Sequence, residues 1–352
     1  MIQEEKTELT EKTELTAGEK VKELQKELTW SFPNIAKEAP SQKEEAFEYC
    51  EAYKAFLDCA KTEREFTQAA VKLLNEAGYA PFEKGRDYKA GDKVYYVNRK
   101  KSLIMTTFGQ REIGAGVRLN VAHIDSPRLD LKPNPMYEKA EMAFFKTHYY
   151  GGIRKYQWAA IPLAMHGVVV KKDGEITDIR IGEEEGDPVF CVTDLLPHLA
   201  ADQNERKLKD GIKGEELNVI IGSLPFTADE DIKEPVKLLA LSVLNEKYGM
   251  TEKDFIRAEI EIVPAFKAVD VGLDRSMVGA YGQDDRVCAY TALTAEMASI
   301  EPEYTTVTVL ADKEEIGSVG NTGLDSDFVL HYIEDLAETA GIDYRTILRN
   351  SI

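Results

Sequence analysis

The sequence predicts an α/β protein in which a β-rich second domain interrupts the first domain. Helix-like segments followed by short strands occur up to about residue 129, helices and a strand return from residue 266, and the stretch between is mostly strand-like. The chain, at 352 residues, is also longer than a typical single domain. We therefore expect one domain made of residues 1–129 and 266–352, and a second domain made of residues 130–265.

Composition and charge limit the classes of function. Apolar residues make up 43% of the chain and aromatic residues 9%, which is enough for packed cores. A net charge of −19 argues against binding to nucleic acids and to anionic membranes. The N-terminus lacks the pattern of a signal peptide, and no run approaches the roughly 20 apolar residues of a membrane span. The four cysteines form no CxxC pair, so we expect free thiols in a soluble cytoplasmic protein.

The first 129 residues are predicted to contain a tail, three helices and three strands. The motif Lys-Thr-Glu-Leu-Thr occurs twice within residues 6–16, and its charge predicts a mobile tail over residues 1–16. Helices are expected at 18–30 and 43–61. Thr62 and Glu65 form a capping box that begins a third helix, which continues to Asn75 and is ended by Gly78. Strands are expected at 93–97, 102–108 and 117–123.

The later elements follow from hairpin, helix and strand signals. Strands at 167–171 and 176–181 flank Lys172-Asp173-Gly174-Glu175, which is a good hairpin signal. A helix is expected at 239–248 and an alternating strand at 255–263. Beyond residue 269 the pattern predicts a helix at 284–299 and a β-branched strand at 305–311. A last helix is expected at 325–340, with Asp325 or Ser326 as its N-cap.

The first candidate site residues are His123 and Asp125, where the strand expected at 117–123 ends. Because one residue separates them, both side chains lie on the same side if the strand geometry persists. Asp125 could then hold one ring nitrogen of His123 and leave the other nitrogen free to bind a metal ion. The alternative is that both residues make ordinary surface hydrogen bonds.

Two pairs of acidic residues supply further candidates. Asp284-Asp285 opens a predicted helix, where an N-cap and a dipole-complementing acid are the usual explanation and a bridging metal ligand is the alternative. Glu314-Glu315 follows a buried strand at the carboxyl edge of a sheet, where open α/β sheets bind ligands. Adjacent carboxylates repel each other, which favours a cation near one of them and a proton near the other. A charged, solvated loop is the alternative.

The three segments together predict one metal site more readily than three unrelated features. One His, one Asp and one Glu would come from three separate element ends, each next to a Gly or Pro turn. Imidazole and carboxylates hold a cation such as zinc, and a spare carboxylate can take the proton of an attacking water. This is the set of groups that a metal-activated hydrolase requires.

Three runs of residues carry a family resemblance: Ala122-His123-Ile124-Asp125-Ser126-Pro127, Gly282-Gln283-Asp284-Asp285-Arg286 and Asp312-Lys313-Glu314-Glu315-Ile316-Gly317-Ser318. Their sequence, order and spacing resemble the motifs of the M18 metallo-aminopeptidases, which include aspartyl aminopeptidase and aminopeptidase I. The related M42 aminopeptidases share the general site, but the long helical N-terminus and His198 favour M18. The resemblance implies a mixed-sheet di-zinc exopeptidase (phosphorylase/hydrolase-like) domain. Residues 130–265 would then form a dimerisation or lid domain inserted into the catalytic domain.

The resemblance also implies a role for each matching residue. His123 would bind one metal ion, Asp284 would bridge two ions, and Glu315 would bind the second ion. Glu314 would be the general base that takes a proton from the attacking water, and Asp125 would orient His123. The implied activity is hydrolysis of the N-terminal peptide bond of peptides through a water bridged by two divalent metal ions. Zinc is the expected metal, although cobalt and manganese accept the same ligands.

His198 is the residue through which the resemblance implies an assembly. It resembles a family histidine that reaches from one subunit into the site of its neighbour and steadies the oxyanion. A homo-oligomer, and specifically a tetrahedral dodecamer, is what the family pattern implies. Without the resemblance, a histidine after proline in an apolar run is more often structural.

The sequence departs from the family pattern after the Glu-Glu motif. Family members carry two further metal ligands, an Asp and a His, on downstream segments, and neither is visible here. Asp327 and His331 fall in a predicted helix and match no family motif, so we expect helix-surface or N-cap roles for them. We therefore expect a chain that lacks roughly the C-terminal quarter of a family member. The alternative to an aminopeptidase is a catalytically silent or truncated metal-binding or assembly subunit, and a di-metal deacylase or carboxypeptidase is a close enzymatic variant.

The preferred N-terminal residue of a substrate is not determined by these motifs. A preference for acidic residues would require a basic pocket, for which Arg128 and Lys132 are the candidates. Both residues could equally be solvated.

Overall fold

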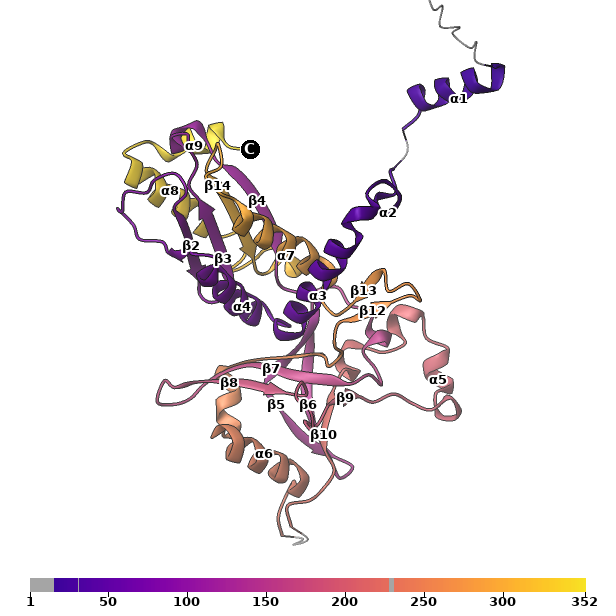
Figure 1. Ribbon diagram of the computed structural model, residues 1–352. Coiled ribbons are helices and arrows are strands. Elements are labelled where there is room, and N and C mark those ends of the chain that lie inside the picture. Colours follow the sequence, from indigo (N-terminus) through magenta and orange to yellow (C-terminus); the bar gives the residue numbers. More distant parts are fainter. Residues whose placement is uncertain (1–15, 31, 228–230) are drawn as a thin grey trace, which may run out of the picture. The chain divides into compact units, whose positions relative to one another are not determined.

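The computed structural model describes residues 16–30, 32–227 and 231–352, which divide into two compact units. One unit ends at Glu51, and the other comprises Ala52–Ile352. The helices are α1 (Ala17–Leu28), α2 (Ile35–Glu38), α3 (Lys43–Cys59), α4 (Glu63–Glu76), α5 (Ala201–Asn204), α6 (Pro235–Tyr248), α7 (Gln283–Ala298), α8 (Phe328–Ala340) and α9 (Tyr344–Asn350) (Figure 1). The strands are β1 (Ala80–Pro81), β2 (Lys93–Asn98), β3 (Ser102–Thr107), β4 (Arg118–His123), β5 (Arg128–Lys139), β6 (Met142–Tyr150), β7 (Leu163–Val170), β8 (Ile176–Ile181), β9 (Cys191–Val192), β10 (Val219–Gly222), β11 (Ala258–Pro264), β12 (Val269–Val271), β13 (Met277–Gly279) and β14 (Thr306–Ala311).

The unit that ends at Glu51 contains α1, α2 and the beginning of α3. Thr16 and Glu19 form a capping box at the start of α1, which has no buried residue. Thr16 is the last residue of the mobile tail expected at residues 1–16, and the rest of that prediction lies outside the described residues.

A five-stranded mixed sheet, in the order β1-β2-β3-β14-β4, combines strands from the beginning and the end of the larger unit. Strand β14 pairs antiparallel with β3 and parallel with β4, and β2 pairs antiparallel with β3. Every residue of β3 is buried, which is the pattern of a strand covered on both faces. The prediction of a mixed-sheet α/β fold is therefore confirmed.

Helices cover both faces of this sheet. Alternate residues of a strand point to opposite faces, so Leu103 and Met105 of β3 pack with α4 and α7, whereas Ile104 packs with α8 and α9. Strand β14 divides in the same way, because Leu310 belongs to the first core and Val309 to the second. This three-layer packing leaves the carboxyl ends of β4 and β14 at one edge of the sheet.

A seven-stranded sheet, in the order β8-β7-β11-β5-β6-β10-β9, lies between Arg128 and Pro264 in the sequence. Its strands pair antiparallel, and the predicted hairpin β7–β8 is present, although β7 begins at Leu163 rather than at 167. Helix α6 packs against β5, β6 and β10 (Figure 1). The packed side chains form a third core that contains Leu129, Phe145, Met165 and Ile262.

Several predicted boundaries differ from the observed ones by a few residues. Helix α6 begins at Pro235 rather than 239, because proline is well suited to the first turn of a helix. Residues 255–257 form the end of a 3-10 helix, and β11 begins only at Ala258. The N-cap of α8 is Asp327 rather than Asp325 or Ser326, whose backbone amides donate to turn carbonyls at Ser318 and Gly323.

The four cysteines are free thiols. Among the described helices, none combines the length and the apolar character needed to span a membrane.

Candidate metal centre

The parallel pairing of β4 with β14 brings two of the sequence motifs together. Ala311 is the register partner of His123, and the backbone amide of Ile124 donates to the oxygen of Ala311 at 2.8 Å. Both strands therefore end at the same edge of the sheet. The 3-10 turn Glu314–Ile316 follows β14 directly, so its two carboxylates lie beside the imidazole at the end of β4.

Asp125 fixes the orientation of the His123 ring. The Nδ1 atom of His123 lies 3.0 Å from the backbone oxygen of Asp125 and 3.4 Å from its Oδ1 atom. With Nδ1 as the donor, Nε2 is left free as a ligand atom. Burial lowers the pKa of His123, but the contacts with Asp125 outweigh burial and raise this pKa to about 9. A metal ion bound at Nε2 would therefore displace a proton from the ring.

The free nitrogen of His123 faces two carboxylates from separate elements. Its Nε2 atom lies 3.3 Å from Oδ1 of Asp284, at the start of α7, and 3.7 Å from Oε2 of Glu314. The Asp284 side chain is 88% exposed and that of Glu314 is 58% exposed, whereas the His123 side chain is only 12% exposed. The His123 ring is therefore the buried part of the site, and the Asp284 and Glu314 carboxylates are its solvent-exposed part.

The prediction of an N-cap at Asp284 or Asp285 is wrong, although both acids lie in the first turn of α7. Gly282 is the N-cap of α7 and makes no side-chain cap. Asp284 and Asp285 themselves have non-helical backbone angles, with ψ values of 112° and 29°. The hydroxyl of Ser126 donates to the backbone oxygen of Asp284 at 3.1 Å, which ties this turn to the loop after β4. The turn directs the Asp284 carboxylate toward His123 instead of toward the helix amides.

The Glu-Glu turn is held by the same carboxylate that orients His123. The backbone amides of Glu314 and Glu315 donate to Oδ1 and Oδ2 of Asp125, each at 3.2 Å. Burial raises the pKa of the Glu315 carboxyl above its ordinary range. Within the described parts of the chain, no lysine or arginine is ion-paired with Asp284, Glu314 or Glu315. Among the described residues, the His123 ring is therefore the cationic group that faces Asp284 and Glu314.

The donor set fits a zinc ion. Ligand atoms of His123, Glu314 and Glu315 all lie within 4.8 Å of one another, and the Asp284 carboxylate adjoins them. One imidazole nitrogen and several carboxylate oxygens are the ligands of a catalytic zinc site with an open position. One cluster thus contains the proposed ligands His123, Asp284 and Glu315, the proposed base Glu314 and the orienting residue Asp125.

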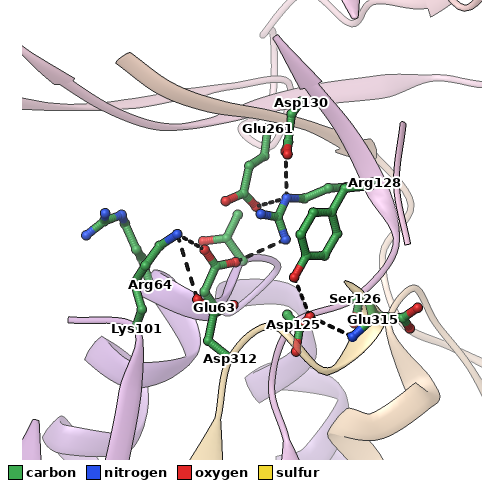
Figure 2. A network of polar contacts seen from close by, with 12 residues as sticks. Glu63, Arg64, Lys101, Asp125, Ser126, Arg128, Asp130, Glu261, Asp312 and Glu315 are labelled. Carbon is green, nitrogen blue, oxygen red and sulfur yellow. Dashed lines mark hydrogen bonds and ion pairs between the residues drawn. The ribbon is translucent and has the colours of Figure 1, made fainter. Parts of the chain in front are cut away.

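A buried ionic network lies behind this site and was not foreseen from the sequence. Figure 2 shows Arg128 at its centre, with its guanidinium 3.4 Å from Glu63, 2.8 Å from Asp130 and 3.2 Å from Glu261. Lys101 pairs with Glu63 at 2.8 Å. Glu63 is fully buried, and the guanidinium and ammonium groups outweigh its burial and hold its pKa below the ordinary range. In the sequence, Glu63 fits an acid in the first turn of α4, so no local signal identifies its partners.

Arg128 is not a solvated or substrate-facing residue. It is 2% exposed, and its charge is neutralised by the network around it. The suggestion that it belongs to a basic specificity pocket is therefore wrong. Lys132, the second candidate, pairs with the exposed Glu215 at 2.8 Å.

The remaining candidate residues lie apart from this cluster. His198 is exposed in the 3-10 turn Pro197–Leu199 and is not among the metal-ligand atoms grouped within the described residues. Asp327 caps α8, and His331 is exposed on that helix, in agreement with the roles expected for them.

The fold and the site define a class of protein, a mixed-sheet α/β scaffold with a divalent-metal donor set at the carboxyl edge of its sheet. The family model described as aminopeptidase I zinc metalloprotease (M18) matches residues 56–352. The chain belongs to the M18 family.

Relatives from several bacteria are similar over most of the chain. A probable M18 family aminopeptidase 1 of Clostridium acetobutylicum is 49% identical over 307 residues, which cover 86% of this chain and 66% of the relative. The corresponding protein of Thermotoga maritima is 47% identical and is covered to 65%, with 85% of this chain aligned. The chain therefore spans slightly less than two thirds of the length of these curated relatives.

Solved structures show the same fold. An M18 aminopeptidase from Thermotoga maritima superimposes with a TM-score of 0.86 at 43% identity, covering 92% of this chain and 71% of that one. Aminopeptidase I from Clostridium acetobutylicum gives a TM-score of 0.83 at 42% identity, with 92% and 72% of the two chains covered.

Proposed function

We propose that this chain carries the metal centre of an aminopeptidase, which hydrolyses the N-terminal peptide bond of peptides with the help of two divalent ions, preferably zinc. The observation that carries this proposal is the register of β4 with β14, which places His123 next to the Glu314-Glu315 turn. Membership of a zinc metalloprotease family supports it. Composition and free thiols are consistent with a cytoplasmic location.

Each residue of the cluster has a distinct proposed task. His123 and Glu315 would each hold one ion, and Asp284 would be shared by both. A bound zinc ion supplies Lewis-acid activation of water and of the scissile carbonyl. Glu314 accepts the proton of the attacking water, for which its 58% exposed side chain suits it, since no lysine or arginine among the described residues pairs with it. Asp125 keeps the His123 ring in the tautomer that leaves Nε2 free.

We further propose that copies of this chain assemble and that His198 acts on the site of a neighbouring copy. His198 is exposed, and the apolar side chains on either side of it, Leu196 and Leu199, are 67% and 71% exposed. Exposed leucines of this kind are typical of surfaces that a second subunit covers. A dodecamer is the assembly that the family resemblance suggests.

The experiment that tests the activity uses the purified chain loaded with zinc or cobalt. Peptides with free N-termini and the same peptides with acetylated N-termini are incubated with the protein, and the products are identified by mass spectrometry. We expect stepwise loss of the N-terminal residue from the free peptides alone, and loss of this activity with a chelator. The substitution Glu314→Gln removes the base and keeps the size of the side chain, so it should lower kcat by roughly 10²–10⁴-fold.

Other outcomes separate the alternatives. Release of C-terminal residues or of the acetyl group would indicate a carboxypeptidase or a deacylase on the same scaffold. Metal bound without hydrolysis of any peptide would favour the silent metal-binding or assembly subunit. An E314Q variant as active as the unmodified chain would contradict the proposed base. Elemental mass spectrometry of the loaded protein gives the number of ions per chain.

A further inference from the structure

Tyr150, the last residue of β6, reaches the metal centre from the seven-stranded sheet. Its side chain is 6% exposed, and its hydroxyl donates to Oδ2 of Asp125 at 2.6 Å. A hydrogen bond to a buried carboxylate is stronger than one between neutral groups. The two sheets of the larger unit therefore meet at the residue that orients His123.

Asp125 connects Tyr150 to the metal centre. Its carboxylate is fully buried and contacts three candidate metal-binding residues: the amides of Glu314 and Glu315 donate to it, and the His123 ring lies beside it. Among the described residues, Tyr150 supplies the only side-chain hydroxyl that donates to this carboxylate. A rotation of the carboxylate would move the imidazole and the Glu-Glu turn together, so whatever fixes its rotation also fixes the site.

The Tyr150 ring is itself held in place. The Arg128 guanidinium lies 3.8 Å from the centroid of this ring, and Glu261, Asp130 and Glu63 hold the guanidinium (Figure 2). A stacked, buried guanidinium of this kind restricts the ring to one orientation. The buried ionic network around Arg128 is therefore connected to Asp125 through the Tyr150 ring.

The residue after Tyr150 contacts the site from the same side. Gly151 has a φ of +71°, and a Cβ atom placed on it would lie 2.8 Å from Oε2 of Glu315. The end of β6 therefore packs closely against a proposed metal ligand. This close approach and the Tyr150 hydrogen bond are two separate contacts between β6 and the metal centre.

We propose that Tyr150 is a positioning residue of the metal centre: its hydroxyl fixes the carboxylate of Asp125, and through it His123 and the Glu314-Glu315 turn, while Arg128 fixes the Tyr150 ring. This inference rests on the proposed metal site. It predicts that removing one hydroxyl group, which contacts no metal ligand, changes how the protein binds a divalent ion.

The test compares Tyr150→Phe with a matched control, Tyr149→Phe. Tyr149 is the neighbouring residue of β6 but is 40% exposed, and its ring stacks beside His148 instead of facing Asp125. Both substitutions remove one hydroxyl and keep the ring. Cobalt(II) alone is titrated into each metal-free protein and followed by its visible absorption, and the melting temperature of each metal-free protein is measured.

We expect Y150F to weaken cobalt binding by about tenfold, within the range typical of changes around a metal ligand. The cobalt absorption spectrum of Y150F should also change, because the ligand geometry is no longer fixed. Y149F should match the unmodified chain in both measurements, and the two metal-free variants should melt at similar temperatures. Peptide hydrolysis, where it is observed, should show a lower kcat for Y150F at an unchanged KM.

Two results would overturn the proposal. One is a Y150F protein that binds cobalt with the affinity and spectrum of the unmodified chain. The other is a metal-free Y150F protein that melts far below Y149F, because the hydroxyl would then serve the fold as a whole. A third result separates the two proposals: the unmodified chain binds cobalt and Y150F binds it more weakly than Y149F, but no peptide is hydrolysed. This result would support the positioning role of Tyr150 and contradict the proposed aminopeptidase activity.

Discussion

His123 and His166 each have a carboxylate facing both ring nitrogens, yet their surroundings differ in a way that residue types alone do not reveal. His166, on β7, is fully buried, with Nδ1 2.7 Å from Glu65 and Nε2 3.1 Å from Glu183. Burial would lower the pKa of His166, but the two carboxylates outweigh it and raise this pKa above its ordinary value. The buried ring therefore joins the carboxylates of Glu65 and Glu183.

The carboxylates around His166 are satisfied by other donors. Glu65 accepts the backbone amides of Lys61 and Thr62 as the capping residue of α4. Glu183 pairs with the ammonium groups of Lys61 at 2.7 Å and Lys267 at 3.1 Å. Such a closed network leaves no ligand atom for a metal ion.

The carboxylates around the Nε2 atom of His123 have no such partners among the described residues. Asp284 and Glu314 are exposed, and each has an ion-pair contact with the His123 ring only. The comparison shows that a histidine is a candidate ligand when the carboxylates facing it lack other cations. A histidine whose facing carboxylates already have donors is structural. The following predictions test this distinction, from the largest expected effect to the smallest.

His166→Gln should lower the free energy of unfolding by about 3 kcal/mol, because it removes one member of a buried, paired ionic cluster. The loss is measured by urea unfolding of the metal-free protein at pH 6. His148→Gln is the control, since His148 is exposed on β6 of the same sheet. Equal stabilities of the two variants would show that the His166 cluster contributes nothing to the fold. Metal binding by the folded H166Q protein should be unchanged.

His123→Gln should weaken metal binding strongly and lower the stability little, which is the opposite of the effects expected for His166→Gln. It should raise the dissociation constant for zinc by at least about 100-fold, because changes outside the ligand shell already cost roughly 10–100-fold. The stability of the metal-free protein should fall by less than in H166Q. Competition with a chromophoric chelator measures the affinity, and His331→Gln on α8 is the control. An H123Q protein that binds zinc normally would remove His123 from the site.

Stability in the presence of a chelator should decline as the pH rises above about 6.5, the ordinary pKa of histidine. The folded protein holds the His166 proton more tightly than the unfolded chain does, because the pKa of His166 is raised. Its contribution is therefore complete below that pH and is lost as the pH passes through the folded-state pKa. Urea unfolding between pH 6 and pH 9 in an H123Q background isolates this effect, since the pKa of His123 is also raised. Adding H166Q to this background should reduce the remaining change of stability with pH. An unchanged pH dependence would mean that groups other than His166 cause it.

Local signals in the sequence were enough for most elements and for the ligands themselves. The Thr62–Glu65 capping box, the β7–β8 hairpin and the buried strand β14 all depend on neighbours a few residues apart, and all are confirmed. The site residues were recognisable because each motif places polar groups directly after an apolar strand or a glycine. A boundary failed at Ser326, whose amide donates to the backbone oxygen of Gly323 in a turn before the helix.

The sequence by itself determined the α/β class, the order of the elements and the residue types of the metal centre, because these follow from hydrophobic period, turn chemistry and capping. Only the tertiary structure decided which charges would be neutralised. Arg128 and Glu63 are 65 positions apart in the sequence and meet only when the two sheets pack, at 3.4 Å. Ionic pairing depends on distance and burial in three dimensions, and no periodic pattern along the chain encodes either. For the same reason, the contact between Tyr150 and Asp125 could not be predicted from the sequence.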